Sequence, residues 1–410
     1  MNRHLIGIGG VGMSALATVY VKLGDKVTGA DRTRDTPNVR RLRGLGVRVY
    51  PDDGRGVDQK VDEVIVSTAI EETNRGLLRA KKLGIPVTHR AKALARALEG
   101  YKLVAVVGTC GKSTVTAMLG HVLAECGLDP MCVNGANVPG WEGAVRFGKG
   151  EYAVAEVDES DKSLVAFKPY AAIVTNASAD HYSKEEMDEV FDAFVKGLPG
   201  PVVDGRKSVE AVSHRFEQEI STSIPGRHNR QNAALALRMA VALGCDEAQA
   251  RAALLTFRGV ERRLQKVGEG VYDDYAHNPE KLHAMLTTLQ EKYEHGGVCV
   301  MWRPHGYAPL RKMKDALAAM FAATLRPQDK LLLLPVYDAG GTTDRSINSK
   351  DLVSAIASVD AAVAARVELV PDLDAAFAWC AARRDAFDCF VTCGARDPGL
   401  PRLAQRIASL

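Results

Sequence analysis

Short apolar runs alternate with helical stretches from the first residues of the chain. The apolar runs are predicted as strands and the stretches between them as helices: strands at 4–8, 26–30, 64–67 and 85–87, and helices at 14–23 and 75–83. A strand, a helix and a second strand in this order form a βαβ unit, whose strands pair in parallel. We therefore predict one small α/β domain over residues 1–98.

The same alternation restarts twice further along the chain. Strands are predicted at 103–107, 152–155 and 172–174, with a helix at 113–126, and then, after a break near Gly259, at 298–301, 330–334 and 389–392. Each region has the pattern of a parallel sheet flanked by helices. The predicted fold is α/β with three domains, a Rossmann-like N-terminal domain (1–98), a central P-loop ATPase-like domain (99–260) and a Rossmann-like C-terminal domain (261–410).

Composition agrees with a folded, soluble protein and excludes some functions. The 410 residues are 46% hydrophobic and 25% charged, and the net charge is only +3. Nucleic-acid-binding domains carry a clear basic excess, so no nucleic acid is expected as a partner. The eight cysteines show no metal-binding spacing, and we expect neither a signal sequence nor a membrane-spanning segment. We expect a cytoplasmic protein that does not act at a membrane, as a monomer or homodimer.

The first glycine-rich turn has the pattern G-x-G-x-x-G over residues 7–12, between a predicted strand and a predicted helix. In this context glycines let backbone N–H groups and a helix N-terminus approach a diphosphate. Asp31 ends the next strand about 20 residues after the last glycine, where its carboxylate can accept hydrogen bonds from a nucleotide. The pattern does not distinguish NAD from a UDP-sugar, because both place a diphosphate at such a turn. The alternative is a glycine turn that is needed only for close packing and binds no nucleotide.

The second turn, Gly108-Thr109-Cys110-Gly111-Lys112-Ser113-Thr114, follows an apolar strand and opens a helix. Its N–H groups and Lys112 can surround triphosphate oxygens, and the Ser113 hydroxyl can reach Mg²⁺. Val106 stands where a full Walker A motif has its first glycine, so the loop is a shorter variant. A coincidental glycine turn is the alternative.

Acidic and polar residues follow the next two predicted strands. The segment 156–161 (Glu-Val-Asp-Glu-Ser-Asp) comes after one, and 176–181 (Asn-Ala-Ser-Ala-Asp-His), with Asp180 and His181, comes after the other. Parallel strands bring such segments to one edge of a sheet, and carboxylate oxygens suit Mg²⁺. The alternative is an acidic, solvated loop and a surface histidine.

Three later segments carry weaker signals. Gly226-Arg227-His228-Asn229, with Asn232 one turn on, begins an alanine-rich helix in which the asparagines either contact adenine or cap the helix. Arg262 and Arg263 follow the predicted domain boundary. The segment 273–279 (Asp-Asp-Tyr-Ala-His-Asn-Pro) closes a strand with acids and a histidine. Arginine beside a transferring phosphoryl group and aspartate on a ribose are the corresponding roles.

The order of these motifs resembles the Mur ligase family, in particular its alanine-adding branch. The motifs are GIGGVGMSALA, VSTAI, GIPVTHRA, GTCGKST, AEVDESDKS, VTNASADH, GRHNRQNA, RR and DDYAHNP, and the resemblance runs from His4 to about Asp397. It implies a ligase that uses ATP and Mg²⁺ to join a small amino acid, L-alanine in this branch, to the carboxylate of a UDP-N-acetylmuramate-like nucleotide sugar. An acyl phosphate would be the intermediate.

The resemblance also implies roles for individual residues. The nucleotide sugar would be bound by Gly9, Gly10, Val11, Gly12, Met13, Ser14, Asp31 and Ser67. ATP would be bound by Gly108, Thr109, Gly111, Lys112, Ser113, Thr114, His228, Asn229, Asn232, Arg262 and Asp274. The metal ligands would be Ser113, Glu156 and His181. The catalytic residues would be Lys112, His181, His277 and His305, and the amino acid would be bound by Tyr275, His277, Arg303 and Arg311.

The chain departs from the branch at several places. Cys110 and Ser113 stand where the branch usually has histidine and threonine, and the segment between His181 and Gly226 is shorter than usual, which predicts a reduced outer part of the central sheet. Gly306 and Pro309 stand where the branch has arginines. Arg303 and Arg311 are the nearest cations that can replace them, although Arg311 also fits an ordinary surface side chain.

Three other functions remain open at this point. A nicotinamide oxidoreductase would use the first glycine loop but would leave GTCGKST without a purpose. A non-catalytic nucleotide-binding protein would fit the missing arginines. A related ligase that acts on a recycled muramyl peptide or on a non-wall acid would fit every motif.

Overall fold

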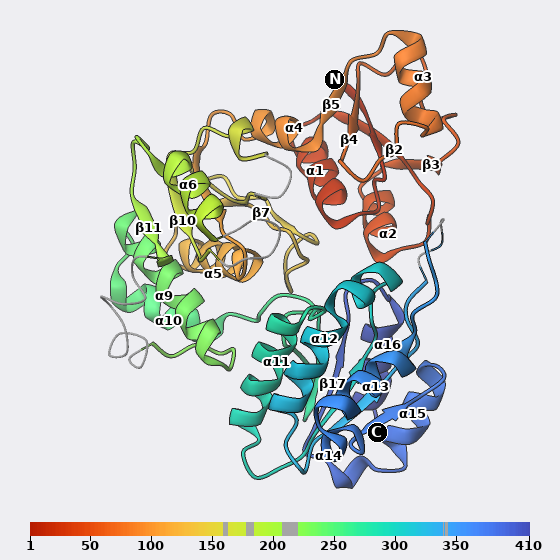
Figure 1. The fold of residues 1–410 in the computed structure, drawn as a ribbon. Coiled ribbons are helices and arrows are strands. Elements are labelled where there is room, and N and C mark those ends of the chain that lie inside the picture. The colour runs from red at the N-terminus through yellow and green to blue at the C-terminus, as the bar shows by residue number, and fades with distance from the viewer. Residues whose placement is uncertain (159–162, 178–183, 207–219, 339, 341–342) are drawn as a thin grey trace. The chain divides into compact units, whose positions relative to one another are not determined.

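The computed structural model describes residues 1–158, 163–177, 184–206, 220–338, 340 and 343–410. The chain divides into two compact units, the first made of Met1–Ile224 with His228–Val260 and the second of Pro225–Arg227 with Glu261–Leu410. Among the described residues the strands form three sheets flanked by helices (Figure 1). The predicted α/β class and the three sheet-containing regions are confirmed.

The first sheet, in the red and orange part of Figure 1, is entirely parallel and has the order β3-β2-β1-β4-β5. Its strands are β1 (Asn2–Ile6), β2 (Lys26–Asp31), β3 (Arg48–Pro51), β4 (Glu63–Val66) and β5 (Val87–His89). Its helices are α1 (Val11–Lys22), α2 (Pro37–Gly44), α3 (Arg75–Leu83) and α4 (Arg90–Ala97). The reversal of strand order at β1 is the switch point at which such sheets bind ligands.

The second sheet has the order β11-β10-β6-β9-β7-β8. Its strands are β6 (Lys102–Val107), β7 (Met131–Val133), β8 (Val145–Arg146), β9 (Tyr152–Glu156), β10 (Ala171–Val174) and β11 (Val202–Asp204). Its helices are α5 (Lys112–Glu125), η1 (Ser163–Ala166), α6 (Lys184–Val195), α9 (Arg227–Ala242) and α10 (Glu247–Thr256). Strand β8 pairs antiparallel with β7, so the expectation of a purely parallel sheet is wrong at this edge.

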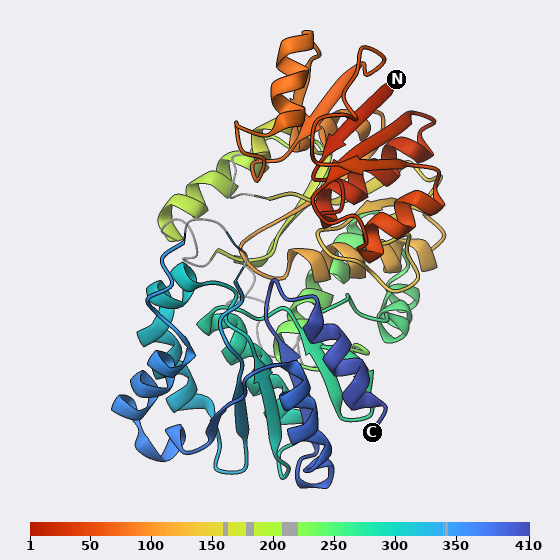
Figure 2. The same ribbon diagram turned by 90° about the vertical axis from the view of Figure 1, so that its right-hand side faces the viewer.

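The third sheet lies in the second unit and has the order β12-β13-β17-β14-β15-β16. Its strands are β12 (Gln265–Gly268), β13 (Val271–Asp274), β14 (Val298–Trp302), β15 (Lys330–Leu333), β16 (Val367–Leu369) and β17 (Cys389–Cys393). Its helices are α11 (Pro279–Lys292), α12 (Tyr307–Thr324), α13 (Ser349–Val359), α14 (Ala361–Ala364), α15 (Leu373–Ala381), η2 (Arg384–Ala386) and α16 (Gly399–Ala408). Helices cover both faces of this sheet (Figure 2), and only β12 is antiparallel to its neighbour.

The first predicted strand is displaced by two residues. It was expected at 4–8, but β1 ends at Ile6 because Gly7 has φ +72° and its N–H already donates to the carbonyl of Ala30, which begins the glycine turn. For the same reason α1 begins at Val11, earlier than the predicted residue 14. The helix predicted at 75–83 matches α3. Short strands such as β3, β7 and β16 carry too little pattern to be predicted.

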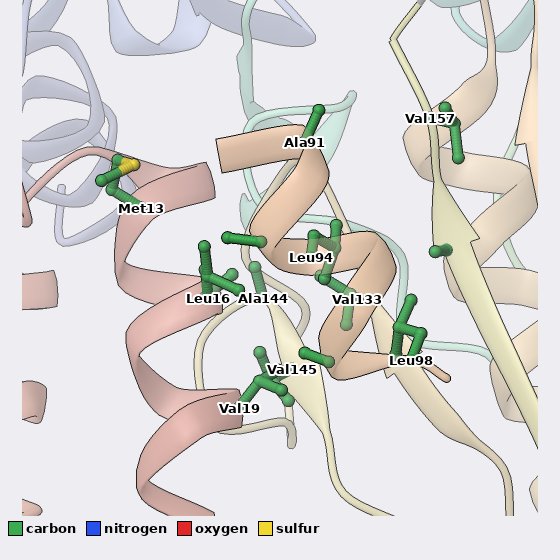
Figure 3. Close-up of a cluster of buried hydrophobic side chains, with 14 of the residues drawn as sticks. Met13, Leu16, Val19, Ala91, Leu94, Leu98, Val133, Ala144, Val145 and Val157 are labelled. Carbon is green, nitrogen blue, oxygen red and sulfur yellow. The ribbon is translucent and has the colours of Figure 1, made fainter. Parts of the chain in front are cut away.

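The core of the first unit continues from the first sheet into the second (Figure 3). Leu16 and Val19 of α1 and Leu94 of α4 belong to the same buried cluster as Val133 of β7 and Val145 of β8. An ion pair of 2.5 Å between Lys22 and Glu142 lies at the rim of this contact. Burial of apolar surface therefore fixes the first two sheets as one body.

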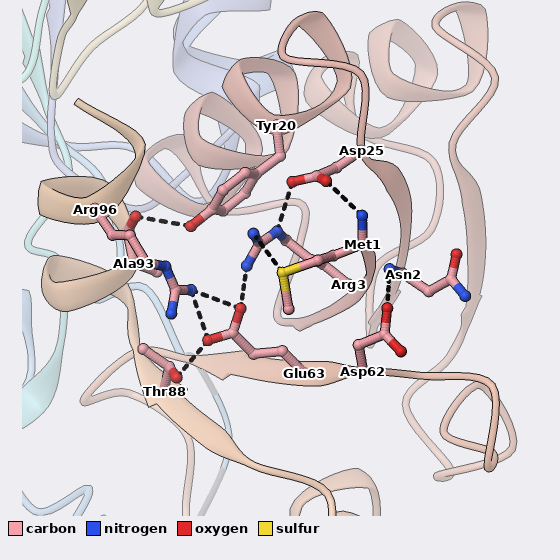
Figure 4. A network of polar contacts seen from close by, with 10 residues as sticks. All are labelled: Met1, Asn2, Arg3, Tyr20, Asp25, Asp62, Glu63, Thr88, Ala93 and Arg96. Carbon is pink, nitrogen blue, oxygen red and sulfur yellow. Dashed lines mark hydrogen bonds and ion pairs between the residues drawn. The ribbon is translucent and has the colours of Figure 1, made fainter. Parts of the chain in front are cut away.

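A buried ionic network ties β1, β4 and α4 together in the first domain (Figure 4). The carboxylate of Glu63, of which 3% is exposed, pairs with Arg3 and accepts hydrogen bonds of 2.7 and 2.6 Å from Arg96. Thr88 donates a further bond of 2.5 Å to it. Burial acts to raise the pKa of Glu63, but these bonds and the two guanidinium charges hold it below its ordinary value.

Two findings concern the state of the cysteines and the search for a membrane-spanning helix. None of the eight cysteines, all of which lie in the described part of the chain, forms a disulfide. Over the same described ranges, no helix combines the length and the apolar character that crossing a bilayer requires.

Candidate active site

The first glycine loop joins β1 to α1 at the carboxyl edge of the first sheet. The Gly9 N–H donates to the Asp31 carboxylate at 2.8 Å, and a Cβ at Gly9 would lie 2.9 Å from the same oxygen. The second carboxylate oxygen of Asp31 accepts from the Thr33 N–H at 2.8 Å. The structure thus brings Asp31 to the loop, as predicted, and Ser67 follows β4 at the same edge.

The N-terminus of α1 is open toward a ligand. Gly10 is its N-cap and supplies no side-chain cap, so the first N–H groups of the helix keep their capacity to bind an anion. Met13 and Ser14 are buried in the first turn, and the Ser14 hydroxyl donates to the Val11 carbonyl at 2.9 Å. The guanidinium of Arg90 lies beside Gly12, 3.2 Å from where a Cβ at Gly12 would be. A cation and a helix N-terminus therefore face the same space.

The second glycine loop joins β6 to α5 and approaches two neighbouring segments closely. Gly108 has φ +126°, and a Cβ there would lie 2.1 Å from the Thr175 hydroxyl. Gly111 has φ +84°, and a Cβ there would lie 2.6 Å from the Asn232 side-chain oxygen. Both glycines are required by their conformation and by the lack of space.

Asn176, the first residue of the NASADH motif, holds this phosphate loop in place. Its side-chain oxygen accepts from the Thr109 hydroxyl at 2.7 Å and from the Cys110 N–H at 2.9 Å. The Cys110 carbonyl accepts from the Thr175 hydroxyl at 2.6 Å and from the Asn176 amide at 3.1 Å. The Lys112 ammonium reaches across the loop to the Gly108 carbonyl at 2.6 Å. The motif was recognised in the sequence, but the hydrogen bonds by which Asn176 orders the phosphate loop were not predicted.

Oxygen ligands for a magnesium ion lie at the same edge of the second sheet. Glu156 ends β9, which pairs with β6, and its carboxylate accepts from the Gly135 N–H at 2.7 Å. Ser113 and Thr114 are buried in the first turn of α5. Carboxylate and hydroxyl oxygens fit Mg²⁺ in kind. The third predicted ligand, His181, lies outside the described residues. Among the described residues, no three histidine, cysteine, aspartate or glutamate side chains are grouped so that they could hold a metal ion.

Helix α9 brings its polar residues beside the phosphate loop. Asn232 lies against Gly111, and Asn229, one turn earlier, is 4% exposed. Burial, together with the charge of Arg230, lowers the pKa of His228. The imidazole is therefore neutral at neutral pH, which suits contact with a nucleotide base.

In the second unit, the acids that end β13 are engaged with the backbone and with Arg262. Asp273 accepts from Arg262 Nε at 2.9 Å and from the Thr392 hydroxyl at 2.7 Å. Asp274 accepts from the N–H groups of Leu264 and Ala276 at 2.6 and 2.7 Å, and burial raises its pKa to about 6. The carboxyl is ionised at neutral pH and fixes the turn before β12. A role on the ATP ribose stays a prediction.

Three aromatic rings meet where β13 and β14 end. His277 makes edge-to-face contacts with Tyr275 and His305, with ring centroids 5.6 and 4.9 Å apart. Its Nδ1 lies 2.9 Å from the Tyr275 carbonyl oxygen. Burial, then the charges of His277, Arg396 and Lys281, lowers the pKa of His305 to about 4. The structure therefore brings together these three predicted residues, with His305 neutral at neutral pH.

The two arginines predicted to bind the amino acid already have partners. Arg303 pairs with Asp397 at 2.5 Å and donates to the Pro335 carbonyl at 3.0 Å. Arg311 pairs with Asp344 at 2.8 Å on the surface of α12. The prediction for each stays untested; the Arg303–Asp397 pair is largely buried, whereas the Arg311–Asp344 pair is exposed.

A cavity of about 510 Å³ lies at the ends of β15 and β16, next to the N-terminus of α13. Asn348, Lys350 and Tyr307 contribute to its wall, and no residue predicted from the sequence lines it. Sequence reasoning also missed Arg90, although the motif that contains it, GIPVTHRA, was recognised. The signal would have been a basic residue directly after β5, at the carboxyl edge of the sheet that carries the first glycine loop.

Two protein-family models match the first and the third part of the chain. Residues 2–102 match the model of the Mur ligase family, catalytic domain, and residues 262–396 that of the Mur ligase, glutamate ligase domain. The UDP-N-acetylmuramate–L-alanine ligase of Paenarthrobacter aurescens is 34% identical, with 89% of this chain and 91% of the relative covered. That of Rubrobacter xylanophilus is also 34% identical, with 92% of each chain covered.

Solved structures share the fold over the whole chain. The UDP-N-acetylmuramate–alanine ligase of Thermotoga maritima superimposes with a TM-score of 0.81 at 24% identity, covering 100% of this chain and 98% of the other. A murein peptide ligase of Psychrobacter arcticus gives 0.67 at 20% identity, covering 100% and 99%. Curated relatives are more than 30% identical over almost all of the chain, and both glycine loops form as the resemblance implies. The chain therefore belongs to the Mur ligase family of ATP-dependent ligases.

Proposed function

We propose that the chain joins L-alanine to the carboxylate of UDP-N-acetylmuramate in an ATP-dependent step of peptidoglycan precursor synthesis. The observation that carries the proposal is the presence of two separate anion-binding loops in one unit, at the ends of β1 and β6. A nucleotide sugar and ATP need one such loop each. The names of the relatives at 34% identity support the choice of substrates.

The reaction has two steps, each of which conserves atoms and charge. An oxygen of the muramate carboxylate attacks the γ-phosphorus of ATP, so that ADP leaves and an acyl phosphate forms. Alanine loses one proton from its ammonium group, and the resulting amine attacks the carbonyl carbon. The attacking nitrogen then gives up one further proton and inorganic phosphate leaves, so that the product amide keeps one N–H. Negative charge develops on phosphoryl oxygens in the first step and on the carbonyl oxygen in the second.

The chain's own residues stabilise this charge. Lys112 would exchange its bond to the Gly108 carbonyl for the transferring phosphoryl group, while Asn176 keeps the loop N–H groups oriented. Magnesium held by Ser113, Glu156 and His181 would neutralise phosphate oxygens. In the second unit, His277 and His305 would lie near the amine, and the His305 ring is neutral above a pH of about 4.

The predicted domains map onto these roles. We propose that residues 1–98 bind the nucleotide sugar, 99–260 bind Mg-ATP and 261–410 bind the amino acid, in a cytoplasmic monomer or homodimer. Arg262 and Asp274 keep their proposed place beside ATP.

The proposal is tested by phosphate release with ATP, Mg²⁺, UDP-N-acetylmuramate and a panel of amino acids. L-Alanine, glycine or L-serine should support turnover, and omission of either substrate should abolish it. Turnover with a recycled muramyl peptide in place of the amino acid, or with a large or acidic amino acid, would exclude the alanine-adding function. Tighter binding of NADH than of UDP-N-acetylmuramate in calorimetry would exclude a nucleotide-sugar site in the first domain.

Arg90→Ala should raise the KM for UDP-N-acetylmuramate by about 10-fold and leave the KM for ATP unchanged. The reason is that Arg90 lies over the first turn of α1, where the diphosphate is expected. Initial rates at varied nucleotide sugar measure the effect. Arg43→Ala is the matched control, since Arg43 is an exposed cation in the last turn of α2. An unchanged KM in Arg90→Ala would mean that the diphosphate lies elsewhere.

A further inference from the structure

An amino acid that enters the ligase site brings a carboxylate that must be neutralised. This follows from the proposed function, on which the inference rests. A carboxylate removed from water without a cationic partner costs several kcal/mol. Gly306 and Pro309, which follow His305, carry no charge. The cation must therefore come from another segment at this edge of the third sheet.

Strand order points to the segment that follows β17. This strand lies between β13, which leads to Tyr275 and His277, and β14, which leads to His305. Parallel pairing brings the carboxyl ends of all three strands to one edge. Residues 394–397 (Gly-Ala-Arg-Asp) thus begin between the two segments that supply the histidine pair.

Three arginines of this part of the chain are already engaged, and a fourth, Arg263, lies over the Tyr275 ring, 5.3 Å from its centroid. Arg262 donates to Asp273 and to the Gly394 carbonyl, at 2.9 and 2.6 Å. Arg303 and Arg311 are paired with Asp397 and Asp344. Each of these three guanidinium groups would have to leave a carboxylate or a carbonyl before it could bind a substrate.

Arg396 is different, because its backbone is fixed while its side chain is exposed. On one side the Gly394 and Ala395 carbonyls accept bonds from Arg262. On the other side Asp397 is 5% exposed and is held by Arg303. Within the residues that the structure describes, the Arg396 guanidinium has no hydrogen-bond or ion-pair partner. Arg396 follows β17 by three residues, and the last residue of β17, Cys393, pairs with Asp274 of β13 and Trp302 of β14, the strands that lead to the histidines. In agreement with this placement, the charge of Arg396 acts to lower the pKa of His305.

We propose that Arg396 binds the α-carboxylate of the incoming amino acid and makes the site specific for acceptors that carry one. A guanidinium can hold a carboxylate through two parallel hydrogen bonds. Because the backbone on both sides of Arg396 is held by hydrogen bonds, the Arg396 side chain loses less conformational entropy when it binds a carboxylate. The amine of the same molecule would then lie toward His277 and His305. Arg303 acts as a positioning residue, through Asp397.

The test compares Arg396→Ala and Arg396→Lys with the wild-type enzyme, using L-alanine and L-alaninamide as acceptors. Arg396→Ala should raise the KM for L-alanine by about 10- to 100-fold, and Arg396→Lys by less. The KM values for ATP and UDP-N-acetylmuramate should stay unchanged. The preference for L-alanine over L-alaninamide should largely disappear in Arg396→Ala. Arg402→Ala is the matched control, since Arg402 is an exposed arginine of α16.

A second measurement is independent of catalysis. NMR titration of the His305 ring should show a higher pKa in Arg396→Ala than in wild type, because a nearby positive charge has been removed. Arg402→Ala should leave that pKa unchanged. An unaltered His305 titration would mean that Arg396 does not face the histidine pair, and would overturn the assignment.

Failure of this inference is distinguishable from failure of the proposed function. If the wild-type enzyme turns over L-alanine and Arg396→Ala keeps its KM and its preference for the carboxylate, only the Arg396 assignment is wrong. A raised KM in Lys350→Ala, with Arg396→Ala unaffected, would place the carboxylate in the cavity beside β15 and β16 and would also overturn it. Absence of turnover in the wild type with every amino acid would contradict the ligase function itself.

Discussion

Replacing Lys112 with alanine should lower kcat by roughly 10²- to 10³-fold and leave binding of UDP-N-acetylmuramate nearly intact. Lys112 begins α5 and already spans the loop to the Gly108 carbonyl, which places its ammonium among the N–H groups that would bind the γ-phosphate. It stabilises charge that grows during phosphoryl transfer, so its loss acts mainly on the transition state. Single-turnover measurement of ADP formation would separate this step from product release.

Lys149→Ala is the control for Lys112, since it removes an exposed lysine from the same domain. It should keep wild-type kcat. Calorimetric titration with UDP-N-acetylmuramate should give the same Kd in Lys112→Ala as in wild type, because that ligand is expected at the first glycine loop. A Lys112→Ala enzyme with near-normal kcat would remove the phosphate-loop assignment, whatever its substrate affinity.

Local sequence patterns were sufficient to predict both glycine loops. Each consists of a buried strand, a glycine turn and a helix start, so all the necessary information lies within about 20 residues. Gly108 and Gly111 were recognised from the motif alone, and the structure adds the reason for them, which is the close approach of Thr175 and Asn232. The α/β class followed from the same alternation, although strand ends were displaced where a glycine turn began early.

The partners of individual side chains could not be predicted, because they depend on the order of strands in a sheet. Asn176 reaches Cys110 because β10 pairs with β6. The segment that contains Arg396 begins between the segments of His277 and His305 because β17 is inserted between β13 and β14. Arg303 was a reasonable candidate by its distance along the chain from His305. No local pattern indicates that Asp397, 94 positions away along the chain, binds the Arg303 guanidinium.

Glu63→Ala should destabilise the first domain by about 3–5 kcal/mol, the largest stability effect expected in this chain. The substitution leaves Arg3, 7% exposed, with its charge buried over the Tyr20 ring and with only Asp25 as a carboxylate partner. Arg96 also loses the carboxylate that connects α4 to β4 (Figure 4). Native-state hydrogen exchange of the β1 and β4 amides measures the loss locally, which suits a chain with more than one domain.

Asp62→Ala is the matched control, because Asp62 is the exposed neighbour of Glu63 and accepts one bond, of 2.7 Å, from the Asn2 N–H. It should cost less than about 1 kcal/mol. Adding Arg3→Met to Glu63→Ala should recover part of the lost stability, since an apolar side chain in place of the orphaned cation removes its desolvation cost. If Glu63→Ala and Asp62→Ala had equal, small effects, the buried charges would not determine the stability of this domain. The continuous apolar core around Leu16 and Leu94 would then hold β1, β4 and α4 together without them.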